Sequence, residues 1–197
     1  MGLEDGRILI VRADPTRDND GDGIPDWDEL GAPNHGDGNE DGIVDSVQPH
    51  VASVPNGVDG TAVTFTADPN STLTNAQSVP NPSPSDAPNA SFPFGHFAFE
   101  LTDVPPGGST SVTLTLPWAA VQSWWKYGRT PGNPTPHWYE FTFDGTTGAD
   151  INGNVVTLHF VDGARGDDDL MANGVIVDPG GPSAYPFAVY LPMTIKD

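Results

Sequence analysis

The sequence predicts an all-β protein: a β-sandwich of the immunoglobulin-like or jelly-roll-like kind, preceded by an N-terminal strand and an acidic loop segment. Three observations predict this class. Gly and Pro together make up 44 of the 197 residues and separate short segments in which apolar and polar residues alternate. About eight or nine such segments recur at roughly 8–15-residue spacing, which is typical of sandwiches. No segment has the 3.6-residue periodicity of an amphipathic helix.

The first expected element is a strand over residues 7–13, a short run rich in Ile and Val. Pro15 then prevents a helix from leading into the acidic segment that follows. Residues 27–30 have room for about one helical turn before Gly31 and Pro33 end it.

The remaining elements are expected to be strands joined by turns. Asn152-Gly153 lies between two apolar segments and predicts a tight hairpin. Residues 79–93 are rich in Pro and Ser and predict a loop. The alternating segments cover residues 61–66, 96–101, 111–116, 124–127, 138–143, 155–160, 175–177 and 187–191.

Charge divides the chain into two parts. Residues 1–50 hold 13 acidic residues against 3 Arg, and residues 51–197 hold 14 against 4 basic residues. Each part therefore carries a net charge of −10, about three times denser per residue in the shorter one. We expect residues 1–50 to form the N-terminal strand and the acidic loops, and residues 51–197 to form the sandwich.

The acidic segment contains a twelve-residue stretch, 18–29, that fits an EF-hand calcium loop at every ligand position. A calcium ion needs six to eight oxygen ligands at about 2.3–2.6 Å, and an EF-hand loop supplies them from positions 1, 3, 5, 7, 9 and 12, with a glycine at position 6. Gly23 occupies that sixth position. The expected ligands are the carboxylates of Asp18, Asp20, Asp22, Asp26 and Glu29 and the backbone carbonyl of Ile24.

A second loop in the same register starts nineteen residues later. Its expected ligands are Asp37, Asn39, Asp41, the carbonyl of Ile43, Asp45 and Gln48. Gln48 stands where Glu29 stands in the first loop, so we expect two calcium sites with the second one weaker. A third site near Asp162 and Asp167–Asp169 is an open possibility. Its alternative is a turn whose carboxylates cap backbone N–H groups.

The surroundings of the loops are not those of a helix–loop–helix. With only one helical turn after the first loop, the segment resembles the tandem Asp-rich repeats of thrombospondin type 3 and dockerin-type secreted modules. In such repeats calcium holds together a chain that has too little apolar content to fold alone. The resemblance implies a structural role for the ions.

The C-terminal part resembles the choice-of-anchor U domain of bacterial surface proteins over about residues 50–182. Uncommon short sequence motifs carry the resemblance, including His137-Trp-Tyr-Glu140 and Arg165-Gly-Asp-Asp-Asp-Leu170. Similar stretches cover residues 126–141, 144–154 and 158–182. The resemblance implies a non-catalytic β domain displayed outside a bacterial cell, with calcium repeats just upstream.

Composition sets limits on partners and location. A net charge of −20 argues against nucleic acid and anionic lipid as partners. The chain has no cysteine, so calcium in place of disulfides would supply rigidity. We find no signal peptide and no apolar run that could insert into a membrane, so we expect a mature chain at the bacterial cell surface or outside it.

Two functions from different classes fit these features. The first is an extracellular structural or interaction protein, not an enzyme, in which a terminal strand complements a neighbouring copy and builds a filament. Residues 7–13 or 187–195 would supply that strand. The alternative is a carbohydrate-binding module of a secreted protein, with sugar stacked on Trp118, Trp124, Trp125, Trp138 and Tyr139.

Overall fold

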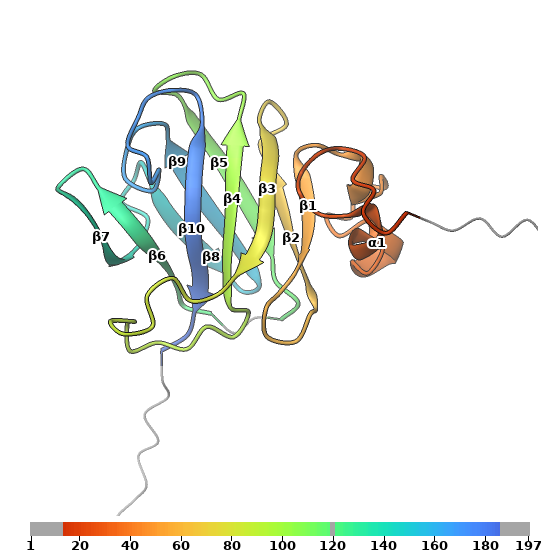
Figure 1. Ribbon diagram of the computed structural model, residues 1–197, viewed down its shortest axis with the longest axis horizontal. Coiled ribbons are helices and arrows are strands. Elements are labelled where there is room, and N and C mark those ends of the chain that lie inside the picture. Colours follow the sequence, from red (N-terminus) through yellow and green to blue (C-terminus); the bar gives the residue numbers. More distant parts are fainter. Residues whose placement is uncertain (1–13, 119–120, 186–197) are drawn as a thin grey trace, which may run out of the picture.

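The computed structural model describes residues 14–118 and 121–185 and confirms the β-sandwich. Two antiparallel sheets of five strands each pack face to face (Figure 1). Sheet A has the strand order β1 (Val51–Pro55), β2 (Ala62–Ala67), β5 (Ser109–Thr115), β9 (Val155–Val161) and β8 (Gly148–Asn152). Sheet B has the order β3 (Thr72–Val79), β4 (His96–Thr102), β10 (Ile176–Ser183), β6 (Ser123–Thr130) and β7 (Asn133–Glu140).

The core forms where the inward side chains of the two sheets meet. Alternating residues of each strand are buried because successive side chains of a strand point to opposite faces. Phe65 of sheet A makes edge-to-face contacts with Phe97 and Phe99 of sheet B, at ring-centroid distances of 5.2 and 5.5 Å. Such contacts between sheets set the spacing of the sandwich.

Most of the expected segments correspond to strands, including the Asn152-Gly153 hairpin between β8 and β9. Residues 80–95 form the expected loop between β3 and β4. The alternation did not reveal β1, β3 or β8. The predicted strand over 138–143 is displaced, because β7 starts at Asn133 and ends at Glu140. The two expected terminal strands, 7–13 and 187–191, lie outside the described residues.

Strand β10 is unusual because it lies inside sheet B yet contains Pro179 and Pro182. Proline cannot donate a ladder hydrogen bond and is rare in a central strand. The register explains why both are accommodated: Ile176–Gly180 pair with β4, whereas Gly180–Ser183 pair with β6. Each proline therefore lies where β10 has only one paired neighbour.

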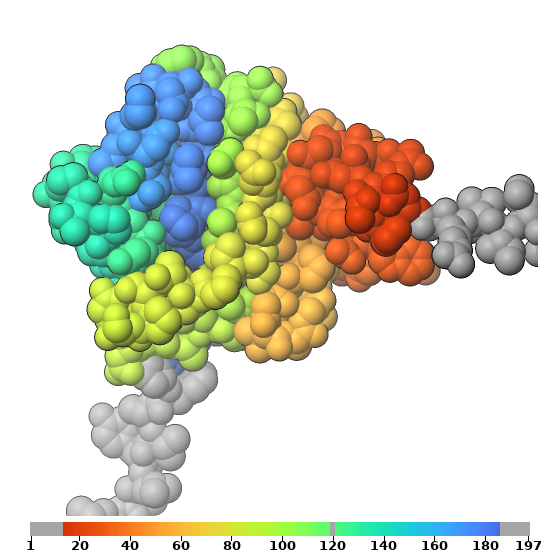
Figure 2. Space-filling view, in the orientation of Figure 1, coloured from red at the N-terminus to blue at the C-terminus, as the bar shows by residue number. Residues whose placement is uncertain are grey.

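The lobe of residues 14–48, called the N-terminal lobe below, sits beside the sheet edges formed by β1 and β3 (Figures 1 and 2). It contains three short helical turns, α1 (Asp26–Glu29), α2 (Pro33–Gly36) and η1 (Asp45–Val47). The single turn α1, ended before Gly31, agrees with the sequence. Ile24 of the lobe is buried in the core of the sandwich.

A bulge in β3 joins the first loop to sheet B. The β3–β4 register shifts between Thr74 and Gln77, and Asn75 adopts a left-handed conformation with φ of 54°. The N–H of Ala76 then donates to the Asp22 carbonyl at 2.8 Å instead of to a strand. The irregularity thus presents a backbone donor to the loop.

Candidate calcium site

The first loop is curled by hydrogen bonds from its own backbone. Gly21 N–H and Gly23 N–H donate to the two carboxylate oxygens of Asp18, at 2.7 and 3.2 Å, and Ile24 N–H donates to Asp22 at 2.7 Å. Gly23 has a φ of 104°. A Cβ there would lie 3.0 Å from the Ala76 nitrogen, so both the backbone conformation and the space favour glycine.

This curl brings carboxylates from alternate positions together. One oxygen from each of Asp18, Asp20 and Asp22 lies within 4.8 Å of the other two, and this is the only such acidic group of three among the described residues. Glu29 enters from α1 and interacts electrostatically with Asp20 and Asp22. Asp22 and Glu29 are fully buried. The cluster therefore concentrates negative charge away from water.

Four oxygens of this cluster are buried and accept no hydrogen bond. They are both carboxylate oxygens of Asp20, Oδ2 of Asp22 and Oε2 of Glu29. A buried polar atom without a partner costs about 1–3 kcal/mol, and more when it is charged. Three neighbouring side chains share these unsatisfied oxygens, which one positively charged group among them could satisfy together.

The pKa values of the cluster report the same arrangement. Burial is the main cause in each case, with repulsion between the carboxylates adding to it. The pKa of Asp20 is raised to about 6, that of Asp22 to about 8 and that of Glu29 to about 9. Without a cation, Asp22 and Glu29 therefore bind protons near neutral pH.

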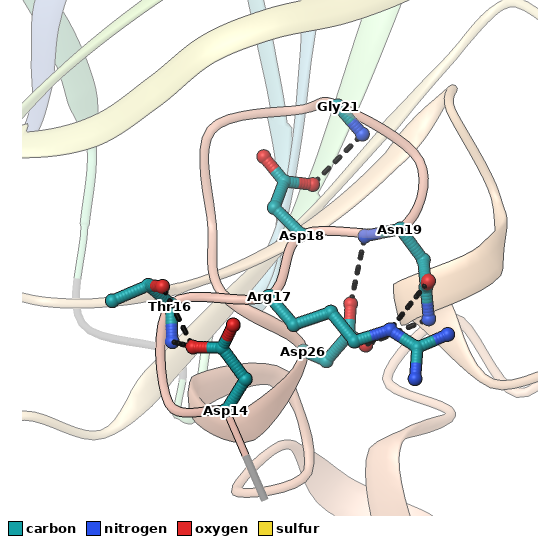
Figure 3. A network of polar contacts seen from close by, with 7 residues as sticks. All are labelled: Asp14, Thr16, Arg17, Asp18, Asn19, Gly21 and Asp26. Atoms are coloured by element: carbon teal, nitrogen blue, oxygen red, sulfur yellow. Dashed lines mark hydrogen bonds and ion pairs between the residues drawn. The ribbon is translucent and has the colours of Figure 1, made fainter.

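Asp26, the expected ligand at position 9, contacts Asn19 and Arg17. Its carboxylate accepts hydrogen bonds from the backbone and side chain of Asn19, at 2.8 and 2.7 Å, and pairs with Arg17 at 3.4 Å. Figure 3 shows Asp26 pointing to Asn19 and Arg17, while Asp18 points to Gly21. Asp26 thus ties the loop entrance to α1. Its place among the ligands stays a prediction.

The second loop repeats the local geometry of the first. Asp37 accepts from the N–H groups of Asp41 and Gly42 at 3.0 Å each, and Asp41 accepts from Ile43 N–H at 2.8 Å. Asp45 accepts from Gly38 N–H. That bond connects loop positions 9 and 2, as Asp26 and Asn19 do in the first loop.

Side-chain amides distinguish the second loop from the first. Gln48 Nε2 donates to Asp41 Oδ1 at 3.3 Å and to the Ile43 carbonyl at 3.1 Å, and Asn39 Nδ2 donates to Asp41 Oδ2 at 3.1 Å. These acceptors are the oxygens expected to bind the ion at positions 5 and 7. The pKa of Asp41 is lowered, chiefly by the Ile43 N–H. The second loop therefore satisfies its own oxygens.

Ser53 of β1 connects both loops to sheet A. Its N–H donates to Glu29 Oε1 at 3.1 Å, and its hydroxyl donates to Asp45 Oδ2 at 2.6 Å. The hydroxyl also lies 2.8 Å from that of Thr64 on β2. Sequence reasoning missed Ser53 and Thr64, since a small polar residue in a strand gives no signal of its own.

The region of the possible third site is built as a turn. Both oxygens of Asp167 accept backbone hydrogen bonds, from Gly163 and Val177. Asp168 accepts from the Arg129 N–H at 2.7 Å, and Asp169 caps Met171. Asp162 Oδ2 accepts from Gly107 and Gly174. Backbone capping accounts for both oxygens of Asp167 and for Oδ2 of Asp162, whereas Asp162 Oδ1 is buried and accepts no hydrogen bond, so the third site stays a prediction.

The aromatic residues considered for sugar binding are mostly engaged within the protein. Trp124 is buried, and the Trp138 indole N–H donates to the Ser83 carbonyl at 3.1 Å beneath the 80–95 loop. Trp125 and Tyr139 are partly covered, and Trp118 is the only exposed one of the five. No flat row of exposed rings is formed by them.

Comparison with known proteins adds no relative: no family model matches the chain, and no match was found among curated proteins or solved structures. The resemblances therefore rest on the residues quoted above. Within the described ranges, no helix has the length and apolar character needed to cross a membrane.

Proposed function

We propose that the first loop binds a calcium ion and that the ion fastens the N-terminal lobe to the edge of the sandwich. The observation that supports this proposal is the set of four buried, unpartnered carboxylate oxygens on Asp20, Asp22 and Glu29. One divalent cation would satisfy them together and would remove the repulsion that raises their pKa values.

The donor set supports calcium in particular. The cluster offers oxygen ligands only, from a curled loop, which suits the higher and more flexible coordination of Ca²⁺ better than the strict octahedron of Mg²⁺. Asp18, Asp20, Asp22 and Glu29 would hold the ion, with the Ile24 carbonyl completing the ring. In the second loop, amide donors compete for the ligand oxygens, so we propose that it binds calcium more weakly.

The position of the cluster supports a structural role. Glu29 is bonded to β1 through Ser53, Asp22 is bonded to β3 through Ala76, and Ile24 between them is in the core. An ion that orders these residues also orders two sheet edges. The proposal places the chain among non-catalytic calcium-binding structural proteins outside the bacterial cell. Assembly through a terminal strand belongs to the same proposal.

Titration calorimetry of EDTA-stripped protein tests the site. We expect calcium to bind wild type and Asp28→Asn alike, and Glu29→Gln at least about tenfold more weakly, a loss of about 1.4 kcal/mol. Asp28 is a matched control because it lies on the same helical turn but is exposed. Absence of calcium binding by wild type at millimolar concentration would refute the proposal.

A further inference from the structure

A second group of charges lies far from the calcium loops, within the sandwich. Lys126 of β6 and Asp178 of β10 are each 1% exposed. Lys and Asp are almost never buried to this degree unless they are paired. Lys126 Nζ lies 4.9 Å from the ring centroids of both Phe141 and Phe160, so aromatic faces wall the pair.

The two groups are in direct contact. Lys126 Nζ lies 2.5 Å from Asp178 Oδ1, which is shorter than the roughly 2.7–2.9 Å usual for a charge-assisted N–H···O bond. Lys126 Nζ also donates to the Gly166 carbonyl. Neither oxygen of Asp178 accepts a hydrogen bond from any other group of the described residues.

As an ion pair, Lys126 and Asp178 have too few hydrogen-bond partners to satisfy both charges. An ammonium has three N–H donors, and among residues 14–118 and 121–185 only two acceptors face this one. Over the same residues, Asp178 Oδ2 has no partner. Two buried ions lose their hydration, and their attraction offsets that loss only when further hydrogen bonds satisfy both. Burial lowers the pKa of Lys126 and raises the pKa of Asp178, so both groups are driven toward their neutral forms.

The strand register holds the two side chains together. Lys126 pairs with Gly180, the last registered pair between β6 and β10 at this end. Asp178 is two residues further along β10, beyond the ladder. There Asp168 separates the strands: its N–H donates to the Val177 carbonyl, and its carboxylate accepts from Arg129 on β6. Lys126 and Asp178 thus bridge a gap that backbone hydrogen bonds leave open.

We propose that Lys126 and Asp178 condense into an intramolecular isopeptide bond that joins β6 to β10. A proton passes from Nζ to Oδ1 and leaves a neutral amine and a carboxylic acid. The amine lone pair attacks Cγ of Asp178, the Cγ–Nζ bond forms and the Cγ–Oδ1 bond breaks. The departing hydroxyl takes a second proton from Nζ and leaves as water. No other reactant takes part.

The product suits its surroundings better than the ion pair does. The amide has a single N–H, and the Gly166 carbonyl is already placed to accept it. Two buried charges disappear, and Asp178 Oδ1, the oxygen in contact with Lys126, leaves as water. The rings of Phe141 and Phe160 exclude the water that hydrolysis would need. Neighbouring reactive groups held in contact also carry the kinetic advantage of an intramolecular reaction.

Intact-mass spectrometry of the purified, denatured wild-type chain tests the proposal without any variant. We expect a mass lower than the sequence mass by one water molecule, and a proteolytic digest in which the peptides containing Lys126 and Asp178 appear only as one linked species. Trypsin should not cleave after Lys126. A chain at full sequence mass, with separate peptides, would overturn the proposal and leave a buried ion pair.

Variants distinguish this linkage from loss of water elsewhere. Asp178→Asn can form the same amide, but it should lose one ammonia instead of one water. Asp178→Ala and Lys126→Met should keep their full mass. Glu140→Gln, a change outside the pair, should lose water as wild type does. Loss of water that persists in Asp178→Ala would refute the assignment to this pair.

Discussion

Replacing Glu29 by Gln should stabilise the calcium-free protein and remove much of the stabilisation that calcium provides. The pKa of Glu29 is raised to about 9 from 4.5. At pH 8 the folded calcium-free protein must therefore hold a proton that the unfolded chain has released. A gap of about 3.5 pH units at about 1.4 kcal/mol each gives roughly 5 kcal/mol of lost stability.

A glutamine needs no proton and so removes that cost. Its oxygen can keep the bond to Ser53 N–H, and its amide can donate to the unpartnered Asp22 Oδ2. Gln48 shows this arrangement in the second loop, where it donates to Asp41 and Ile43. The variant should make the first loop resemble the second.

Thermal unfolding at pH 8, with and without calcium, measures both effects. Water entering the calcium-free loop reduces the full figure, so we expect a gain of at least about 2 kcal/mol in EDTA, or about 4–8 °C in Tm for a chain of this size. In calcium at a hundredfold excess over the wild-type Kd, wild type should gain about 2.7 kcal/mol, whereas a variant that binds calcium tenfold more weakly should gain only about 1.4 kcal/mol. Asp28→Asn should show neither change. A Glu29→Gln variant that melts at or below wild type in EDTA would refute the electrostatic argument.

Three further predictions follow from the same contacts. The raised pKa values of Asp20, Asp22 and Glu29 make calcium-free stability highest at acid pH, and it should fall between about pH 4 and 9; melting in EDTA at pH 5 and pH 8 checks this, and an increase with pH would contradict it. Gln48→Glu should replace an amide donor by a charged ligand and tighten calcium binding in the second loop at least about tenfold in calorimetry; unchanged binding would show that Gln48 does not limit that loop. Ile24→Ala should cost about 2–5 kcal/mol in denaturant unfolding, because Ile24 is buried in the core, whereas the same change at exposed Ile43 should cost under about 1 kcal/mol; equal effects would mean that the lobe is not anchored by Ile24.

Local patterns predicted the parts of the fold that depend on neighbours in sequence. The alternation in 96–101 and 155–160 predicted β4 and β9, and Asn152-Gly153 predicted the hairpin, because these signals are short-range. β10 was predicted only in part, since its prolines are tolerated for a reason that lies in the pairing of two distant strands. β3 was not predicted, because a bulge interrupts it and directs the Ala76 N–H to the first loop.

The candidate site, like the fold, was predicted only in part. Loop spacing predicted that Asp18, Asp20 and Asp22 converge. It could not show that Asp26 turns to Asn19, or that Gln48 donates to the oxygens of its own loop. Lys126 and Asp178 are 52 positions apart, so only the tertiary structure brings them into contact.

The lobe that carries the loops also decides which edges of the sandwich are open. β7, the edge strand of sheet B farthest from the lobe, contains Pro134 and Pro136, which cannot donate to an added strand. β3 contains no proline and β1 has one only at its last residue, Pro55. In their place, Ser53 N–H is covered by Glu29, and Ala76 N–H by the Asp22 carbonyl. Unpaired edges of this kind are templates for aggregation. If the ion holds the lobe in place, calcium concentration governs the solubility of the protein as well as its folding, and a chain depleted of calcium would be lost first to precipitation.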